Sequence, residues 1–174
     1  MSVIEREYEM DEKSGEETNC RLFLNSSIRE AKMAGKSLFD IVTKTEDDEE
    51  DDLGEEIEMM TEALLTKKGG RISVTYKECS EGLENVKTSV SFMEDDRNII
   101  TVCRGDGGEG FVIEKGKINF NLYRTPYGII EMCVYGKNVE NTLTEEGGEI
   151  VMDYSVELKG MCAQRTKMKF KVVM

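Results

Sequence analysis

Hydrophobic and polar residues alternate along much of the chain, most clearly in two stretches near its end. Residues 149–159 and 163–173 place apolar side chains largely at every second position, with charged or polar side chains between them. Only an extended backbone sends alternate side chains to opposite faces, so each stretch is predicted to be a half-buried β-strand. The residues expected inside this strand pair are Ile150, Met152, Tyr154, Met168 and Phe170.

A short glycine-bearing connection, residues 159–161, joins the two stretches and is typical of a hairpin. Aligning the two apolar faces places Leu158 opposite Cys162. The same register brings opposite charges together, and each such cross-strand pair contributes about 0.2–1 kcal/mol. The predicted charge pairs are Asp153 with Lys167 and Glu149 with Lys171.

Earlier segments show the same alternation and are separated by short connections rich in glycine or charge. Short strands at such regular spacing predict an antiparallel sandwich or barrel. Alternating strands and helices are not indicated, so a nucleotide-binding parallel sheet is not expected. The apolar positions expected on one face of each strand are Leu22, Leu24 and Ile28; Ile57, Met59, Ala63 and Leu65; Ile72, Val74 and Tyr76; Val86, Val90 and Phe92; and Ile118, Phe120 and Leu122, whereas residues 98–104 are apolar on both faces.

Two segments depart from the strand pattern. Residues 1–17 are polar and acidic, and we expect a flexible N-terminal segment followed by one domain over residues 18–174. Residues 31–54 interrupt the strand series as an acidic insertion, whose first part fits a short helix or a strand pair equally well. Its run of acidic residues lacks the interleaved ligands and glycine of a calcium loop, so a solvated segment is expected.

Charge and composition exclude several classes of partner. The 174 residues carry a net charge of −13, which would repel nucleic acid and an anionic membrane surface. No apolar run is long enough to span a bilayer, and the acidic N-terminus is unlike a signal peptide. We therefore expect a cytoplasmic protein with neither nucleic-acid nor membrane partners, and the sequence leaves the oligomeric state open.

The absence of histidine restricts the available chemistry. It removes the histidine-based nucleophile pairs and the commonest general base at neutral pH. The five cysteines are scattered, without a Cys-x-x-Cys pair, so neither disulfides nor a structural metal site is expected. With no acidic pair placed on the almost wholly apolar inward faces, we expect no enzyme, catalytic residue or cofactor.

A turn at residues 122–138 concentrates aromatic side chains. Pro126 and Gly128 predict a stiff bend, and three of the six tyrosines lie in this stretch. Tyr123, Arg124 and Tyr127 come from this one corner. They can form the mouth of a ligand cavity, or they can plug one end of the fold as ordinary packing.

The sequences LYRTPYG and EMCVYGKNVE, followed by EEGGEIVMDYSVELKG, resemble the YwiB-like bacterial proteins, a domain of unknown function with a calycin-like β-barrel. The resemblance runs from about Cys20 to the end of the chain, with residues 31–54 as a long connection. It implies a closed or nearly closed barrel of about eight strands, and no activity or catalytic residue to carry over. The chain lacks tryptophan and therefore the Gly-x-Trp signature of lipocalins.

Together, the pattern and the resemblance predict an all-β, antiparallel, calycin-like barrel of about eight to ten hairpin-connected strands. A barrel of this size is filled by its own side chains or holds one small ligand. We expect a non-catalytic protein that binds a small apolar or amphipathic molecule. The alternative is a packed-core interaction or scaffold protein. The candidate ligand-binding residues are Tyr123, Arg124, Tyr127, Met132, Met152, Tyr154 and Met168.

Overall fold

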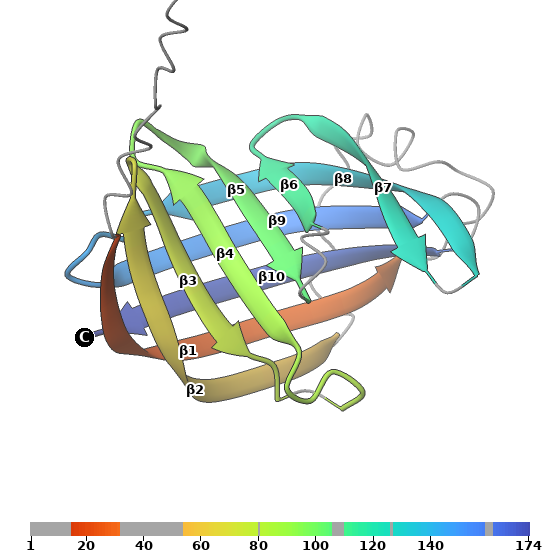
Figure 1. Ribbon diagram of the computed structural model, residues 1–174. Helices are drawn as coiled ribbons and strands as arrows, with labels where there is room; N and C mark the ends of the chain where they lie inside the picture. The colour runs from red at the N-terminus through yellow and green to blue at the C-terminus, as the bar shows by residue number, and fades with distance from the viewer. Residues whose placement is uncertain (1–14, 32–53, 80, 106–109, 126, 159–161) are drawn as a thin grey trace, which may run out of the picture.

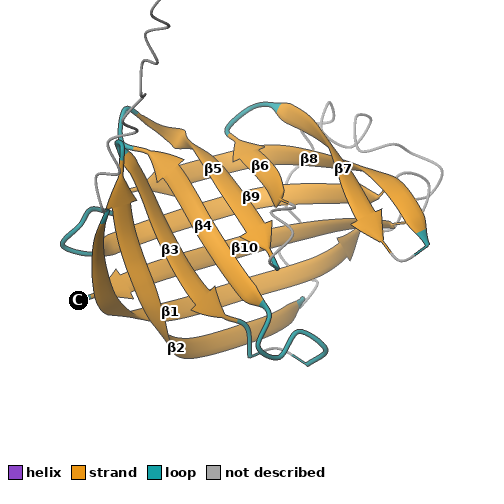
Figure 2. Cartoon of the chain, viewed as in Figure 1, coloured by secondary structure: helices purple, strands orange, loops and turns teal. Residues whose placement is uncertain are grey.

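The computed structural model describes residues 15–31, 54–79, 81–105, 110–125, 127–158 and 162–174. All regular structure in these ranges is β-strand (Figure 2). The ten strands are β1 (Glu16–Ala31), β2 (Glu55–Lys68), β3 (Arg71–Lys77), β4 (Lys87–Met93), β5 (Asp96–Arg104), β6 (Gly110–Glu114), β7 (Ile118–Thr125), β8 (Gly128–Asn141), β9 (Gly148–Leu158) and β10 (Cys162–Val173).

The strands form one antiparallel sheet in the order β6-β5-β4-β3-β2-β1-β10-β9-β8-β7. The sheet curls on itself, so that β3, β4 and β5 cross over the wall made by β1, β10, β9 and β8 (Figure 1). The first strand therefore lies between β2 and the last strand. This arrangement confirms the prediction of an all-β antiparallel barrel.

Backbone contacts between the β6–β7 connection and the middle of β8 nearly close the barrel. The Gly116 N–H donates to the Gly136 carbonyl at 2.7 Å, and the Gly136 N–H donates to the Lys117 carbonyl at 3.2 Å. Position 136 lies at a register shift in β8. A Cβ there would run into the backbone carbonyl of Glu114, so glycine is what allows the two backbones to approach this closely.

The inward faces of the strands build a single hydrophobic core. Every strand except β7 contributes to it, and alternation along each strand sets the inward face. The predicted inner residues of the final hairpin are confirmed, since Ile150 and Phe170 are fully buried and face each other. The largest fully buried side chains are Phe92, Phe170, Leu22, Ile72, Ile100, Ile113, Leu143, Ile150 and Met152.

The register predicted for the last hairpin is also confirmed. Leu158 pairs with Cys162, and the two predicted charge pairs are direct cross-strand neighbours. Asp153 also forms an ion pair with Arg165, at 2.9 Å. Two N–H groups of that arginine donate to both carboxylate oxygens of Asp153, which is the fork geometry that favours arginine over lysine.

The prediction for β7 has the faces reversed. Phe120 and Leu122 are exposed, whereas Asn119 and Asn121 face the barrel. The physical reason is the pairing with β8. Asn121 lies opposite Met132, whose side chain is buried, and the alternation along a paired strand then fixes the face of every other residue.

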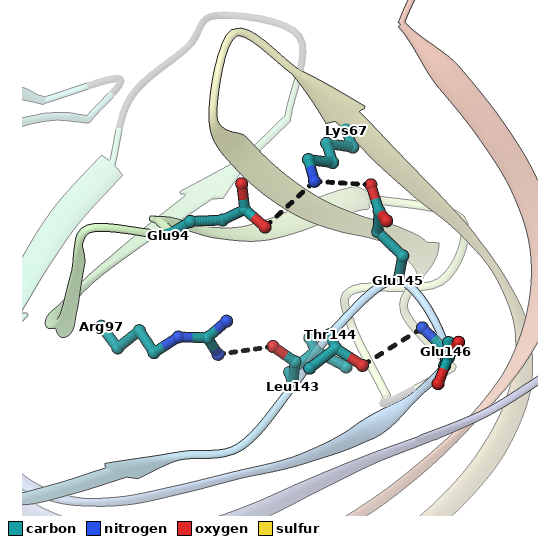
Figure 3. Close-up of polar contacts among 7 residues, drawn as sticks. All are labelled: Lys67, Glu94, Arg97, Leu143, Thr144, Glu145 and Glu146. Atoms are coloured by element: carbon teal, nitrogen blue, oxygen red, sulfur yellow. Dashed lines mark hydrogen bonds and ion pairs between the residues drawn. The ribbon is translucent and has the colours of Figure 1, made fainter.

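Charged side chains close one end of the barrel, where the β2–β3 and β4–β5 turns meet the β8–β9 loop (Figure 3). Lys67 Nζ lies 3.1 Å from a carboxylate oxygen of Glu94 and 2.7 Å from one of Glu145. Arg97 donates a 2.7 Å hydrogen bond to the carbonyl oxygen of Leu143. These contacts tie three connections together over the fully buried side chain of Leu143.

Two predicted segments fall mostly outside the described residues. β1 begins at Glu16, so the last two residues of the predicted N-terminal segment belong to the barrel. β1 also extends to Ala31. Residues 32–53, which contain nearly all of the predicted acidic insertion, lie outside the described ranges.

Candidate ligand-binding cavity

A cavity of about 400 Å³ occupies the end of the barrel opposite the Lys67 ion pairs. Its walls come mainly from the second half of β1 and from β9 and β10, and other strands add single side chains such as Phe111 of β6, Tyr123 of β7 and Met132 of β8. Its volume falls within the range of about 300–1,000 Å³ that is typical of small-molecule sites. A further hollow of about 480 Å³ lies on the outer face of β1, β2 and β10, between side chains such as Phe23 and Met60.

A buried carboxylate stands in the cavity wall. Glu78 directly follows β3 and is 7% exposed. Its Oε1 accepts hydrogen bonds from Thr88 Oγ1 at 2.9 Å and from the hydroxyl of Tyr76 at 3.3 Å. Arg104 Nε lies 3.9 Å from the same oxygen. Hydroxyl donors and a nearby positive charge together compensate for the burial of this carboxylate.

Alternation along neighbouring strands explains why these polar groups meet. On β3 the inward series that begins with Ile72 and Val74 continues through Tyr76 to Glu78. On β5 the inward series of Ile100 and Val102 continues to Arg104. Thr88 of β4 pairs with Tyr76 on one side and with Arg104 on the other, so the three strands form one polar row.

Two tyrosines, Tyr76 in this row and Tyr154 in the cavity wall, are held in their protonated form. Burial is the largest effect that raises the pKa of Tyr76 above its ordinary value, and the nearby Glu78 charge raises it further. Burial likewise raises the pKa of Tyr154, against smaller opposing effects from Arg104 and from a hydrogen bond with Thr166. Both phenols therefore remain hydrogen-bond donors at neutral pH, and neither is activated as a nucleophile or a base.

The structure brings four of the seven predicted site residues together around the cavity. Tyr123, Met132, Tyr154 and Met168 line it. Met152 lies in the packed core of β9 with 1% exposure and is not part of the lining. The other two, Arg124 and Tyr127, lie at the tip of the β7–β8 hairpin, where both side chains are exposed. The stiff corner therefore supplies one residue to the cavity, Tyr123.

The prediction that the inward faces are almost wholly apolar is wrong. Glu78 and Arg104 lie on these faces and line the cavity. Both could have been found by extending the period of two by one step beyond the last apolar residue of each strand. The side-chain nitrogens of Asn119 and Asn121 are also buried, and neither has a hydrogen-bond partner within the described part of the chain. The two asparagines are buried because the inward face of β7 is the opposite of the predicted one.

The cysteine side chains that the structure describes do not line the cavity. Cys20, Cys79, Cys103 and Cys133 are free thiols, and burial raises the pKa of Cys20 and of Cys133. Among the described residues, no three acidic or cysteine side chains are grouped as metal ligands. Within the same ranges, no helix is long and apolar enough to cross a membrane.

Comparisons with known proteins agree with this architecture. Residues 40–170 match a family described as a domain of unknown function, DUF1934. The crystal structure of the ywiB protein from Bacillus subtilis is similar, with a TM-score of 0.62 and 20% sequence identity, over 92% of this chain and 96% of that chain. No curated protein matches the sequence. The resemblance to the YwiB-like proteins is thus confirmed, and the chain belongs to the DUF1934 family.

Proposed function

We propose that this protein is a non-catalytic binding protein for a small amphipathic molecule, which it holds in the cavity at the open end of the barrel. The observation that carries the proposal is the cavity itself, about 400 Å³ in a fold whose remaining interior is packed. A barrel whose only task was to be a rigid scaffold would gain stability from filling this space with side chains.

The lining supports an amphipathic guest over a purely apolar one. Apolar side chains such as Ile28, Met132 and Leu158 provide an adaptable surface for a hydrocarbon body. The Glu78–Arg104 pair and the phenols of Tyr76 and Tyr154 provide polar contacts in the same space. A few oriented polar groups within a mainly apolar pocket are the usual composition of a small-molecule site.

The proposal is tested by filling the cavity. Val156 lines it on β9, whereas Val151 on the same strand lies on the other face. We expect the wild-type protein to carry co-purified small molecules in native mass spectrometry and to be stabilised thermally by medium-chain amphiphiles, and we expect Val156→Trp to lose both. Val151→Trp, the matched control, should retain both. If the folded Val156→Trp protein takes up the same molecules as the wild type, the cavity is not their binding site.

A second candidate is an interaction protein that acts through the outer face of the β7–β8 hairpin. Four apolar side chains are largely exposed there, with exposures of 81% for Phe120, 67% for Leu122, 99% for Tyr127 and 63% for Ile129. β7 is also an edge strand of the sheet, and an exposed apolar edge invites pairing with another strand.

The partner that fits this edge is a second copy of the chain. Antiparallel pairing of two β7 strands about Asn121 sets Phe120 of one copy opposite Leu122 of the other, which places the exposed apolar residues on a shared face.

Sedimentation velocity tests this candidate. Phe120→Lys should dissociate the dimer, while Phe23→Lys, on the outer face of β1, should leave it intact. A monomeric wild-type protein at high concentration would exclude the candidate.

A further inference from the structure

The proposed ligand-binding function leaves the chemical class of the ligand open. Resting on that function, we propose that the cavity selects molecules with a single carboxylate head on an apolar body, and that Arg104 binds the carboxylate. Among the described residues that line the cavity, Glu78 and Arg104 carry the only formal charges. Their environments differ in a way that assigns each a separate role.

Arg104 is the partner that remains available to a ligand. Its side chain is 44% exposed, and its Nε lies 3.9 Å from Glu78, beyond hydrogen-bonding distance. Within the described part of the chain, its guanidinium therefore makes a loose ion pair and no hydrogen bond. A guanidinium offers five N–H donors in a planar fork that matches the two oxygens of a carboxylate.

Glu78 has the opposite character, because its contacts are already made within the protein. Thr88 and Tyr76 donate to the same carboxylate oxygen, and the side chain is almost fully buried. This carboxylate is therefore poorly placed to receive a cationic ligand. Its negative charge instead holds Arg104 near the cavity wall, which lowers the entropy lost when the guanidinium binds an anion.

The negative charge of Glu78 also limits the ligand to one negative charge. The carboxylate of a monoanionic ligand can accept hydrogen bonds from the Arg104 guanidinium. The protonated phenol of Tyr154 lines the same cavity, near enough for Arg104 to influence its pKa, and is a second donor. A dianion such as a phosphate monoester would bring a second negative charge towards Glu78, with no second cation among the described lining residues. The apolar body then packs against side chains such as Ile57, Leu158 and Met168.

The test compares probes that share one hydrocarbon chain and differ in the head group. Dodecanoate, dodecanol, dodecylamine and dodecyl phosphate are titrated below their micellar concentrations, with affinity measured by calorimetry and by thermal shift. We expect dodecanoate to bind at least about tenfold more tightly than the other three, as is usual for a charge-assisted hydrogen-bonded pair. Equal affinity for dodecanoate and dodecanol would overturn the carboxylate assignment and leave the proposed function standing.

Substitutions test which residue binds the head group of the ligand. Arg104→Gln should weaken dodecanoate binding by about tenfold or more and change dodecanol binding by less than about twofold. Arg124→Gln is the matched control, because that arginine lies outside the cavity, and both affinities should stay at the wild-type value. An equal loss for both probes in folded Arg104→Gln would overturn the role of Arg104.

Glu78→Gln gives a second result that does not depend on Arg104→Gln folding. Removing the neighbouring negative charge should tighten dodecanoate binding several-fold. Dodecylamine binding tighter than dodecanoate, and lost in Glu78→Gln, would overturn the proposal in favour of a cationic ligand. Failure of all four probes to bind the wild-type protein would count against the proposed function itself, and the assignment of the head group would fall with it.

Discussion

Thr88 of β4 donates a 2.9 Å hydrogen bond to the buried carboxylate of Glu78, ten residues earlier in the chain. Because the bond satisfies a buried charge, we expect Thr88→Val to lower the free energy of unfolding by about 1–3 kcal/mol. Thr75→Val, on the opposite face of β3, is the control and should cost less than about 0.5 kcal/mol. Urea denaturation of both variants measures the difference, and equal losses would show that the bond contributes little.

Alkaline pH should destabilise the protein steeply. The pKa values of Tyr76 and Tyr154 are raised by burial, whereas in the unfolded chain both ionise near their ordinary value of about 10. Above about pH 10 the unfolded state therefore loses protons that the folded state keeps, and stability falls as pH rises through the folded pKa values. Each tyrosine contributes a slope of about 1.4 kcal/mol per pH unit.

Ultraviolet absorbance of tyrosinate, recorded with circular dichroism, checks this expectation. Two phenols should ionise only as the fold is lost. Tyr154→Phe should reduce the slope of stability against pH by about 1.4 kcal/mol per unit. Ionisation of every tyrosine while the circular dichroism remains native would contradict it.

The final hairpin offers a test of core packing. Phe170 is fully buried and its ring centre lies 5.9 Å from that of Tyr76. Phe170→Ala should cost about 3–5 kcal/mol because it empties an aromatic core site. Lys169→Ala, one position away, removes an exposed ion pair with Glu149 and should cost about 0–1 kcal/mol. Chemical denaturation compares the two, and similar losses would show that the core is not organised as described.

Closure of the barrel should depend on Gly136. A Cβ at this position would meet the backbone of Glu114, so Gly136→Ala should cost about 1–3 kcal/mol, as overpacking commonly does. It should also speed hydrogen exchange of the Gly116 amide, which bonds to the Gly136 carbonyl. Gly69→Asn is the control, because its turn has φ 58°, which asparagine tolerates, and open space around it. Unchanged exchange at Gly116 would contradict this account of the closure.

The sequence predicts the strands and the register of the last hairpin well, because each rests on local rules. Alternation marks the inward face wherever apolar residues face a core, as in the series ending at Tyr76 and the pair Met152 and Met168. Family resemblance and turn spacing together predict a barrel. The pairing of β1 with both β2 and β10 is a long-range choice that alternation alone does not encode.

The candidate site was harder to predict because its polar residues are defined by contacts across strands. In the sequence, Glu78 and Arg104 resemble the charged residues found at the ends of many strands. Only the position of β4, with Thr88 between β3 and β5, shows that they lie together. At the β7–β8 corner, by contrast, a concentration of aromatic residues suggests a site, and of the candidates there only Tyr123 lines the cavity. Tyr127 is almost fully exposed there, because the hairpin tip extends beyond the cavity. Alternation also holds on β7, but there the apolar residues Phe120 and Leu122 lie on the outward face.

The place of β1 between β2 and β10 has a consequence for how the chain folds during its synthesis. β1 leaves the ribosome before the other described strands and can pair with β2 early, but its other edge pairs with β10, with Arg21 opposite Val173. At translation rates of about 5–20 residues per second, that edge waits roughly eight to thirty seconds for its partner. During that interval the nascent chain has an unpaired strand edge beside apolar side chains such as Leu22 and Leu24. Chaperones bind surfaces of this kind, and such surfaces also promote aggregation.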